Sequence, residues 1–362
     1  MNKISKTLVL GLFSTLAFAQ SETNVPLYSS GYLALPGTTS ELALAGSANP
    51  HGYNHQVFSL GILDLNNQLG ISSIPSISGS HGPTSSLNRV GANYKLNEST
   101  ALTASLGYFT AGDVELRDND GNILGQFTPY ETDLRIGVVK KLAKDFNLGV
   151  RLGYLTTNLG SSINTASITE SSLLVDFSLD YTIKETEKSV LRTYWSLNNI
   201  GKKNNFDDDN LNYLPAQMAL GIVFEHQISE NLSIVPQLQL QKFLVPTPPN
   251  YNADGTIFSG QEQNTNIMAS LFTSFNDAPE GSSEEVKEWC PIISSQLIVK
   301  EKILIAIGAS LENQQKGNRQ FVSLGLGYRT DKIILNTAYL IPISDAAGYF
   351  QGSFGAGLQY FL

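Results

Sequence analysis

The chain has 362 residues, of which only 15% are charged; Gly (31), Tyr (15) and Phe (17) are plentiful, and Met (3) is scarce. The formal net charge of −9 argues against a nucleic-acid partner, because nucleic-acid binding needs a basic surface. One cysteine, Cys290, excludes an intramolecular disulfide framework, and no long Gly, Ser or Pro linker divides the sequence, so a single domain is expected.

Residues 1–19 have the pattern of a secretory signal peptide. Lys3 and Lys6 precede an apolar run over 8–16, and Ala17-Phe18-Ala19 supplies a small-x-small cleavage pattern. Removing the two lysines would change the formal charge from −9 to −11. Beyond residue 20 no run of about 18 apolar residues exists, which excludes transmembrane helices but not a membrane protein.

Segments in which apolar and polar residues alternate recur along the rest of the chain. Residues 146–154, 173–182 and 232–241 show the alternation most clearly, and a period of two indicates strands with one apolar face. These segments have about ten residues, which suits a tilted strand crossing a bilayer, whereas strands of soluble proteins cluster near five or six. We therefore predict an outer-membrane β-barrel, with a secreted β-sandwich as the alternative.

The connections between the predicted strands alternate between short turns and long loops, as in bacterial barrels with short periplasmic turns and longer extracellular loops. A first strand within about 55–74 and a last one at 351–362 complete fourteen antiparallel strands, with both chain ends on the short-turn side. Residues 266–275 also look strand-like, and we assign them to a long excursion over 243–291, as an extension above the membrane. The twelve remaining strands are predicted at 87–96, 99–110, 129–140, 146–157, 172–183, 189–198, 215–226, 232–242, 292–300, 303–312, 319–329 and 332–341.

The strand at 232–242 is predicted to place its Leu and Ile side chains toward lipid and its Gln side chains toward the lumen. Pro236 falls on the lipid side and has no backbone donor, so it should mark a bulge or an unpaired position. Pro246, Pro248 and Pro249 then end the sheet pairing. The prolines form either a stiff rim or a docking edge for a partner.

The segment 276–290 is predicted to contain a short helix. Ser282 and Glu285 have the spacing of a capping box, which would open a helix through Val286 and Trp289. This helix either covers a loop or, with the prolines, forms a docking surface. The partner-binding candidates are Leu244, Pro246, Pro248, Pro249, Tyr251, Asp277, Pro279, Glu284, Glu285 and Trp289.

The sequence contains no arrangement of residues that indicates catalysis, a cofactor or a metal, and we expect a protein that is not an enzyme. The acidic stretches 117–122 and 206–210 fit a turn and a solvated loop better than cation sites. Cys290 is expected to be structural. Arg151 and Arg329 lie on polar strand faces, where they either line an aqueous path or pair with Asp176 and Asp180; pairing is the preferred interpretation.

Several motifs carry a resemblance to a known family. They are "LRDNDGNILGQFTPYE" at 116–131, "NNIGKK" at 198–203 followed by "YLPAQMALG" at 213–221, "LVPTPP" at 244–249, "SFNDAPEGSSEEVKEW" at 274–289 and "KGNRQFVSLGLGYR" at 316–329. In this order they resemble the PorV family, the outer-membrane component of the type IX secretion system of Bacteroidota. The resemblance extends from about residue 87 to the C-terminus.

The resemblance implies a FadL-like barrel over 55–362, located in the bacterial outer membrane. It implies association with a SprA/Sov-type translocon barrel, reception of cargo bearing a type IX C-terminal signal domain, and transfer of that cargo to a PorU-type attachment complex. The family has an N-terminal segment that plugs the lumen, and 20–54 is the corresponding segment here. It offers only "LALAGSANPHGYN" at 42–54, a departure from the family pattern that leaves both the plug and a divergent paralogue open. A FadL-like transporter of a hydrophobic small molecule and a partner that only plugs a translocon gate are the alternatives.

Overall fold

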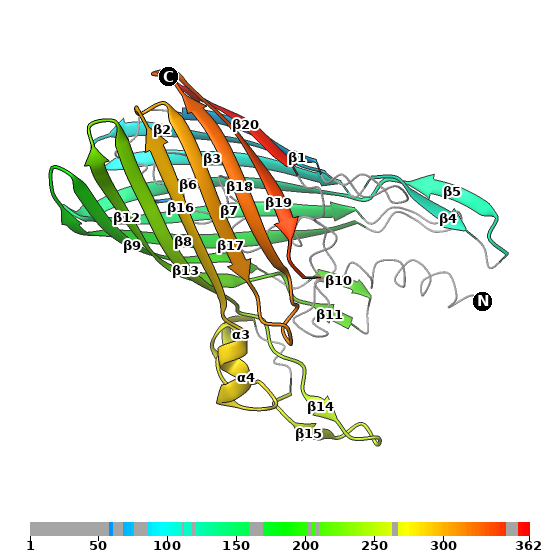
Figure 1. The fold of residues 1–362 in the computed structure, drawn as a ribbon. Helices are drawn as coiled ribbons and strands as arrows, with labels where there is room; N and C mark the ends of the chain where they lie inside the picture. The colour runs from blue at the N-terminus through cyan, green and yellow to red at the C-terminus, as the bar shows by residue number, and fades with distance from the viewer. Residues whose placement is uncertain are drawn as a thin grey trace.

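The computed structural model describes residues 58–60, 68–75, 86–110, 112–117, 120–158, 169–201, 204–207, 210–262, 267–344 and 354–362. Within these ranges, fourteen antiparallel strands form a closed barrel, in which the first strand pairs with the last (Figure 1). The strand number and antiparallel order agree with the prediction from sequence. The predicted signal peptide at 1–19 and the segment at 20–54 lie outside the described residues and stay predictions.

The barrel strands follow one another around the wall in chain order. They are β1 (Gln68–Pro75), β2 (Ser86–Asn97), β3 (Thr100–Thr110), β6 (Tyr130–Ala143), β7 (Phe146–Asn158), β8 (Thr169–Glu185), β9 (Ser189–Gly201), β12 (Gln217–Ser229), β13 (Leu232–Phe243), β16 (Cys290–Val299), β17 (Ile303–Leu311), β18 (Gln320–Arg329), β19 (Ile333–Pro342) and β20 (Phe354–Phe361).

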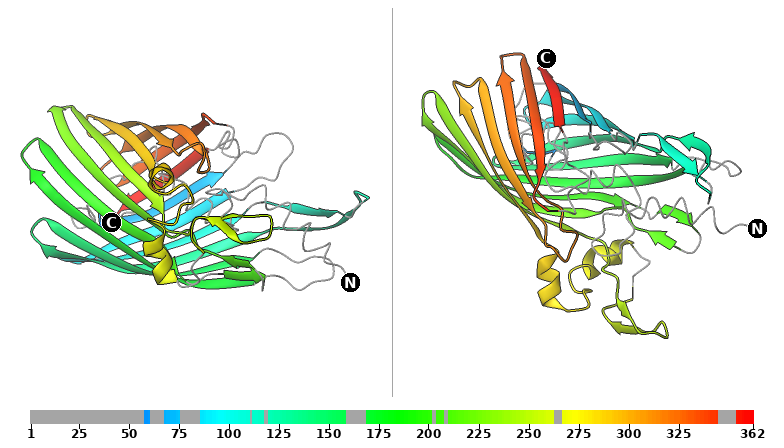
Figure 2. Two further views of the ribbon diagram at one scale, coloured as in Figure 1. Left: turned by 90° about the horizontal axis from the view of Figure 1, so that it is seen from below. Right: turned by 45° about the vertical axis from the view of Figure 1, so that its right-hand side comes forward.

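Smaller elements extend the long connections at one end of the barrel. Three two-stranded hairpins and two short helices are described there: β4 (Val114–Arg117) with β5 (Ile123–Phe127), β10 (Asn204–Asp207) with β11 (Asn210–Asn212), β14 (Asn250–Tyr251) with β15 (Ile257–Ser259), α3 (Ile267–Thr273) and α4 (Ser282–Lys287). Figure 2 shows them from two further sides, at the rim opposite the chain's C-terminus. Neither helix, nor any other in the described part of the chain, has the length and apolar character needed to traverse a bilayer.

The two faces of the wall differ in the sense expected for a membrane barrel. On β6, Leu134 and Ile136 are exposed on the outside, while Asp133 and Arg135 are buried inside. Such a distribution would expose a large apolar surface to water in a soluble protein, but it matches lipid outside and polar groups inside a barrel. Exposed tyrosines lie toward both ends of the strands, where a membrane barrel has its two aromatic girdles: Tyr94, Tyr181, Tyr328 and Tyr360 toward the short turns, and Tyr108, Tyr154 and Tyr339 toward the long loops. The sequence also suggests Phe109 and Phe361 for these girdles, but both are buried on the inner face.

Strand β13 has the predicted orientation. Its glutamines at 237, 239 and 241 are buried, while Leu238 and Leu240 are exposed. Pro236 is paired with Ser295 of β16 but with no residue of β12, although the β12–β13 register is the same on both sides of it. The proline therefore leaves an unpaired position without a bulge, because it lacks the backbone N–H that the ladder requires.

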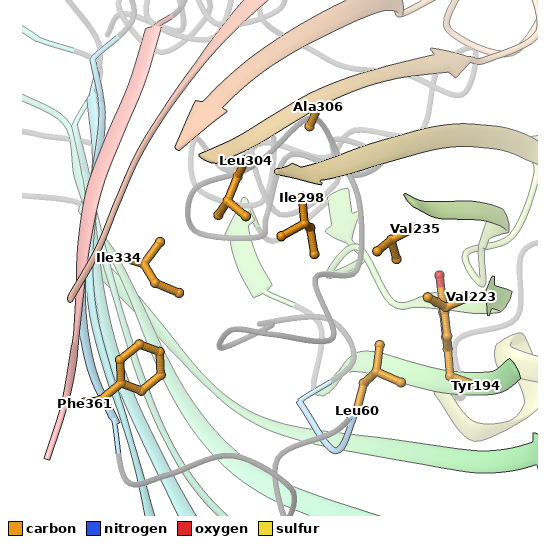
Figure 3. Packing of buried hydrophobic residues seen from close by; sticks show 9 residues of the cluster. All are labelled: Leu60, Tyr194, Val223, Val235, Ile298, Leu304, Ala306, Ile334 and Phe361. Atoms are coloured by element: carbon orange, nitrogen blue, oxygen red, sulfur yellow. The ribbon is translucent and has the colours of Figure 1, made fainter. Parts of the chain in front are cut away.

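The barrel interior contains an apolar cluster in addition to polar groups. Leu60 does not lie on the wall: it belongs to the turn 58–60, which the barrel encloses. The first described strand, β1, begins at Gln68, within the predicted 55–74 range. Figure 3 shows the cluster, which consists of Leu60 and inward-facing residues of seven strands: Tyr194, Val223, Val235, Ile298, Leu304, Ala306, Ile334 and Phe361.

The strand-like segment 266–275 is placed correctly in the long excursion, but its predicted strand is wrong. Residues 267–273 form the helix α3. Ser270, Leu271 and Ser274 are buried, whereas Phe272 is exposed, and this spacing fits a helix rather than the period of two of a strand. A lone strand there would leave its backbone groups unpaired, and a helix satisfies them within the segment.

Candidate functional site

The connection between β13 and β16, residues 244–289, is called the outer excursion here. It begins after Phe243, the last residue of β13, and the side chain of the preceding Lys242 is buried. The Lys242 ammonium is 3.2 Å from the Glu285 carboxylate and also donates to Glu288, which lies just after α4. A buried ammonium is stable only when it is paired, so these contacts fasten α4 to the end of the barrel wall.

A second lysine joins the same helix to the loop between β17 and β18. Lys316 Nζ lies 2.5 Å from Glu284 Oε1 and 2.9 Å from Glu288 Oε1. Thr247 Oγ1 donates to Glu288 Oε1 at 2.6 Å. Burial alone would raise the pKa of Glu288, but Lys242, Thr247 and Lys316 outweigh it and hold this pKa below its ordinary value. Glu288 thus stays ionised and connects three segments of chain.

The predicted capping box at Ser282 and Glu285 is wrong, although the short helix itself is confirmed. Helix α4 begins after Gly281, and no side chain caps its N-terminus. Glu285 Oε1 instead accepts hydrogen bonds from the backbone N–H groups of Asp277 and Ala278, at 2.8 and 3.0 Å. Its other oxygen faces Lys242, so Glu285 ties the preceding loop to the barrel rather than to its own helix.

Asp277 is the acidic residue of this network that is least suited to carry charge. Its Oδ2 accepts a hydrogen bond from the Thr247 backbone at 3.1 Å, while its Oδ1 is buried without a partner. Burial raises the pKa of Asp277 to about 6, and the charges of Glu285 and Glu288 act in the same direction. The outer excursion therefore contains a carboxyl group whose pKa of about 6 lies well above the ordinary 3.8 of an aspartate.

The structure gathers the ten predicted partner-binding residues into one folded unit, but it turns most of them inward. Leu244 packs with Ala216 and Leu271, and its N–H donates to the Ala216 carbonyl at 2.7 Å. Trp289 is half-buried against Phe275. The rest are buried (Pro246, Pro249, Asp277, Glu285), half-buried (Pro248, Pro279, Glu284) or, for Tyr251, exposed.

These positions favour the stiff-rim interpretation of the prolines over direct contact. The side chains that do face outward are apolar residues that the sequence prediction did not select. Phe258 on β15 is 75% exposed, Phe272 on α3 is 74% exposed and Val286 on α4 is 71% exposed. Their sequence signal was weak, because single apolar residues in a polar loop are as common in packed loops as at interfaces. With Tyr251, Ile257 and Met268 they form the set called the exposed apolar residues here.

The second candidate region is the lumen, where residues 58–60 contact the wall directly. The Phe58 ring lies under the Arg151 guanidinium, 4.2 Å from ring centroid to Cζ, and packs with Ala101 and Val139. Gly149 makes room for this ring, since a Cβ there would lie 2.5 Å from Phe58 Cε2. Ser59 Oγ is 2.7 Å from Ser178 Oγ. A turn of the chain therefore occupies the barrel interior.

A buried ion network adjoins this turn through Arg151. Arg135 donates to Asp133 at 2.8 Å, to Asp176 at 2.6 Å and to Asn199 at 2.8 Å. Arg151 also pairs with Asp176, at 2.8 Å, which confirms the predicted pairing for this arginine. Asn199 has a φ of 62° at a bulge opposite Asp176, and its N–H donates to that carboxylate at 2.8 Å. Every described charge at the centre of this network has a partner of opposite sign.

Other predicted features have simpler outcomes. Arg329 does not meet Asp176 or Asp180: it lies at the short-turn end, with its guanidinium 5.9 Å from the centroid of the Phe361 ring. Gly121 has a φ of 84°, as the predicted turn requires, and 206–210 lies partly outside the described residues. Cys290 is buried, 3.4 Å from Ser310 Oγ. In the described part of the chain, no three His, Cys, Asp or Glu residues are grouped for metal binding.

Comparisons with known proteins agree with this architecture. A family model described as type IX secretion system protein PorV matches residues 38–250. Curated protein sequences give no match. Among solved structures, the TodX ΔS2S3 mutant monoaromatic hydrocarbon channel is 12% identical with a TM-score of 0.52, covering 90% of this chain and 98% of that chain.

Two further structures are similar at lower scores. The Pseudomonas putida toluene transporter TodX is 11% identical with a TM-score of 0.45, covering 89% of this chain and 96% of its own. A Pseudomonas aeruginosa FadL homologue is 11% identical with a TM-score of 0.46, covering 90% and 98%. At 12% identity, the similarity to the TodX mutant channel indicates a shared fold alone.

Proposed function

Because the chain belongs to the PorV family of type IX secretion system proteins, we propose that it receives secreted cargo on the outer excursion and passes that cargo on at the cell surface. The family match covers more than half of the chain, and the protein is an outer-membrane barrel. The cargo would be a folded protein bearing a type IX C-terminal signal domain.

The observation that supports this proposal most strongly is a rigid support for exposed apolar side chains. Glu288 joins the excursion to Lys242 on β13 and to Lys316 on the β17–β18 loop. On this support, Phe272 of α3 and Val286 of α4 are mostly exposed, and Phe258 is mostly exposed on the hairpin that extends from it. Large apolar side chains presented by a preorganised scaffold are typical of a protein-binding surface, because little ordering entropy is lost on binding.

The predicted partner-binding residues then divide into two roles. Tyr251 would contact the partner with the other exposed apolar residues. The prolines at 246, 248 and 249 and the carboxylates at 277, 284 and 285 would position that surface, as would Leu244, Pro279 and Trp289. Cargo would arrive from a SprA/Sov-type translocon barrel and leave to a PorU-type attachment complex. No covalent step on this chain is required.

Cargo capture tests the proposal. Tagged protein carrying Phe258→Ser and Phe272→Ser would be purified from outer membranes, and the recovered signal-bearing cargo would be quantified by mass spectrometry. Loss of two central apolar anchors should lower recovery by about tenfold or more. The matched control is Ile123→Ser with Leu124→Ser on the hairpin β4–β5, where both side chains are also exposed. Unchanged recovery, or an equal loss in the control, would count against the excursion as the cargo surface.

A FadL-like transporter of a hydrophobic small molecule is the second candidate function. The apolar cluster around Leu60 favours it, because it places apolar side chains inside a barrel that is otherwise lined by polar groups. Uptake of labelled oleate by vesicles containing the purified protein would support transport. Vesicles containing protein with unfolded barrel strands are the control. Equal oleate uptake by the two kinds of vesicle would exclude transport.

A further inference from the structure

An apolar groove lies on the outside of the barrel wall, far in the sequence from the outer excursion. It spans β2, β3, β6 and β7 and has a volume of about 590 Å³. Its floor is a pair of small side chains, Ala92 and Ala104, which face each other across β2 and β3. Ile136 and Leu152 continue the same cross-strand row on β6 and β7. Two alanines between larger side chains leave a depression in the wall.

Larger side chains border the depression on both sides. Toward the short turns the border is the row Tyr94–Leu102–Val138–Val150, and toward the long loops it is the row Val90–Leu106–Leu134–Tyr154. The outward side chains of both rows are apolar or aromatic. Tyr94 belongs to the girdle at the short-turn end, so the groove lies in the half of the bilayer nearer the periplasm.

A lysine stands at the short-turn end of this groove. Lys140 is two residues beyond Val138 on the same outward face of β6, which places it about 7 Å further along the strand. It is exposed, and its neighbours across the sheet are Thr100 and Leu148. The charged residues of the two adjacent turns and strand ends are Lys95, which pairs with Glu98 at 3.1 Å, and Lys141, Lys144 and Asp145.

The local charge around the groove end is therefore positive, with four lysines, Lys140 included, against two acidic residues. An apolar depression inside a bilayer is filled by acyl chains, and a lysine at the membrane surface attracts an anionic head group. We propose that the groove with Ala92 and Ala104 at its floor binds one phospholipid of the periplasmic leaflet. An acyl chain of the lipid lies on the two alanines, and the phosphate of the lipid lies at Lys140.

Native mass spectrometry of the full-length protein tests this binding. Protein purified in mild detergent would be stripped of lipid and titrated with phosphatidylglycerol and, separately, with uncharged diacylglycerol. Ala104→Leu fills the depression with a side chain suited to a lipid-facing wall, and it should weaken retention of both lipids about tenfold. Lys140→Gln should weaken phosphatidylglycerol about fivefold and leave diacylglycerol unchanged.

Matched controls come from outside the groove, one from the far wall and one from the strand next to β7. Ala309 faces outward on β17 between Ile293 and Val322, and Lys184 is exposed on β8. Ala309→Leu and Lys184→Gln should both retain lipid like the unchanged protein. Equal retention by Ala104→Leu, or equal losses in the controls, would overturn the proposal. A third result would also overturn the proposal: Ala104→Leu binds lipid unchanged but loses a co-purifying outer-membrane protein. The groove would then be a protein interface.

Discussion

At the scale of single residues, Asp277 and Glu288 show how one network can treat two carboxylates differently. Burial raises the pKa of Asp277 to about 6, whereas lysine and threonine partners hold the pKa of Glu288 low. Because the Asp277 value lies above its ordinary 3.8, the stability that it contributes is present below about pH 4 and is lost as the pH rises through about 6. The pKa of Glu288 is held below its ordinary value, so the stability that Glu288 contributes is present at neutral pH. That stability is lost only as the pH falls through the lowered pKa.

This difference predicts the effect of Asp277→Asn. The amide can still accept the Thr247 N–H, but it carries no buried charge, so the excursion should open less readily at pH 7, by about 1 kcal/mol. At pH 4 the substitution should bring no such gain. Hydrogen exchange of the 244–289 peptides at the two pH values measures the opening. Glu262→Gln, at an exposed position of the same excursion, is the control, and an equal gain at both pH values would contradict the assignment.

At the scale of elements, the outer excursion consists of an outer hairpin and a fastened base. The hairpin β14–β15 closes where Asn250 pairs with Ser259, so its ends lie side by side. The base contains Thr247, which bonds both Asp277 and Glu288. The hairpin can therefore be removed without touching the contacts that hold α4, whereas a longer deletion cannot.

Two deletions should separate these parts. Replacing residues 251–258 with two glycines should leave the hydrogen-exchange protection of α4 unchanged, because every contact between α4 and the barrel remains. Deleting 246–260 also removes Thr247, and the protection of α4 should fall several-fold. The barrel strands should keep their protection in both variants. If α4 loses protection equally in the two, the hairpin is part of the support.

At the scale of the whole molecule, the alternation of short turns and long loops sets the orientation in the membrane. The six short turns and the C-terminus share one end of the barrel, and α3, α4 and the described hairpins share the other (Figure 1). Bacterial barrels have short turns in the periplasm, so the outer excursion should face the cell exterior.

Cysteine labelling of intact cells checks this orientation. A membrane-impermeant maleimide should label Asp254→Cys in the outer excursion of intact cells. It should label Asp331→Cys, in the turn between β18 and β19, only after the outer membrane is permeabilised. The native Cys290 is buried and should stay unlabelled in both. Labelling of Asp331→Cys in intact cells would invert the assigned orientation.

The prediction from sequence was most successful for the wall of the barrel. The face of each strand residue depends on a period of two that is written locally, so the glutamines at 237, 239 and 241 could be assigned to the lumen directly. The parity of the strands and the length of the connections followed from the same local pattern. Turn residues such as Gly121 were likewise recognisable, because their backbone conformation is a local property.

Contacts between distant parts of the chain decided the rest. Phe58 lies under Arg151, which is 93 positions away in the sequence. The helix 267–273 packs through Leu271 against Leu244, 27 positions away. Lys242 pairs with Glu288, 46 positions away. The 266–275 prediction failed for this reason: its apolar residues suit a strand, but only the surrounding loop shows that no neighbouring strand is in place to pair with it. Local periodicity thus specifies the wall, whereas the occupied lumen and the outer excursion arise from long-range packing and charge pairing that no local pattern encodes.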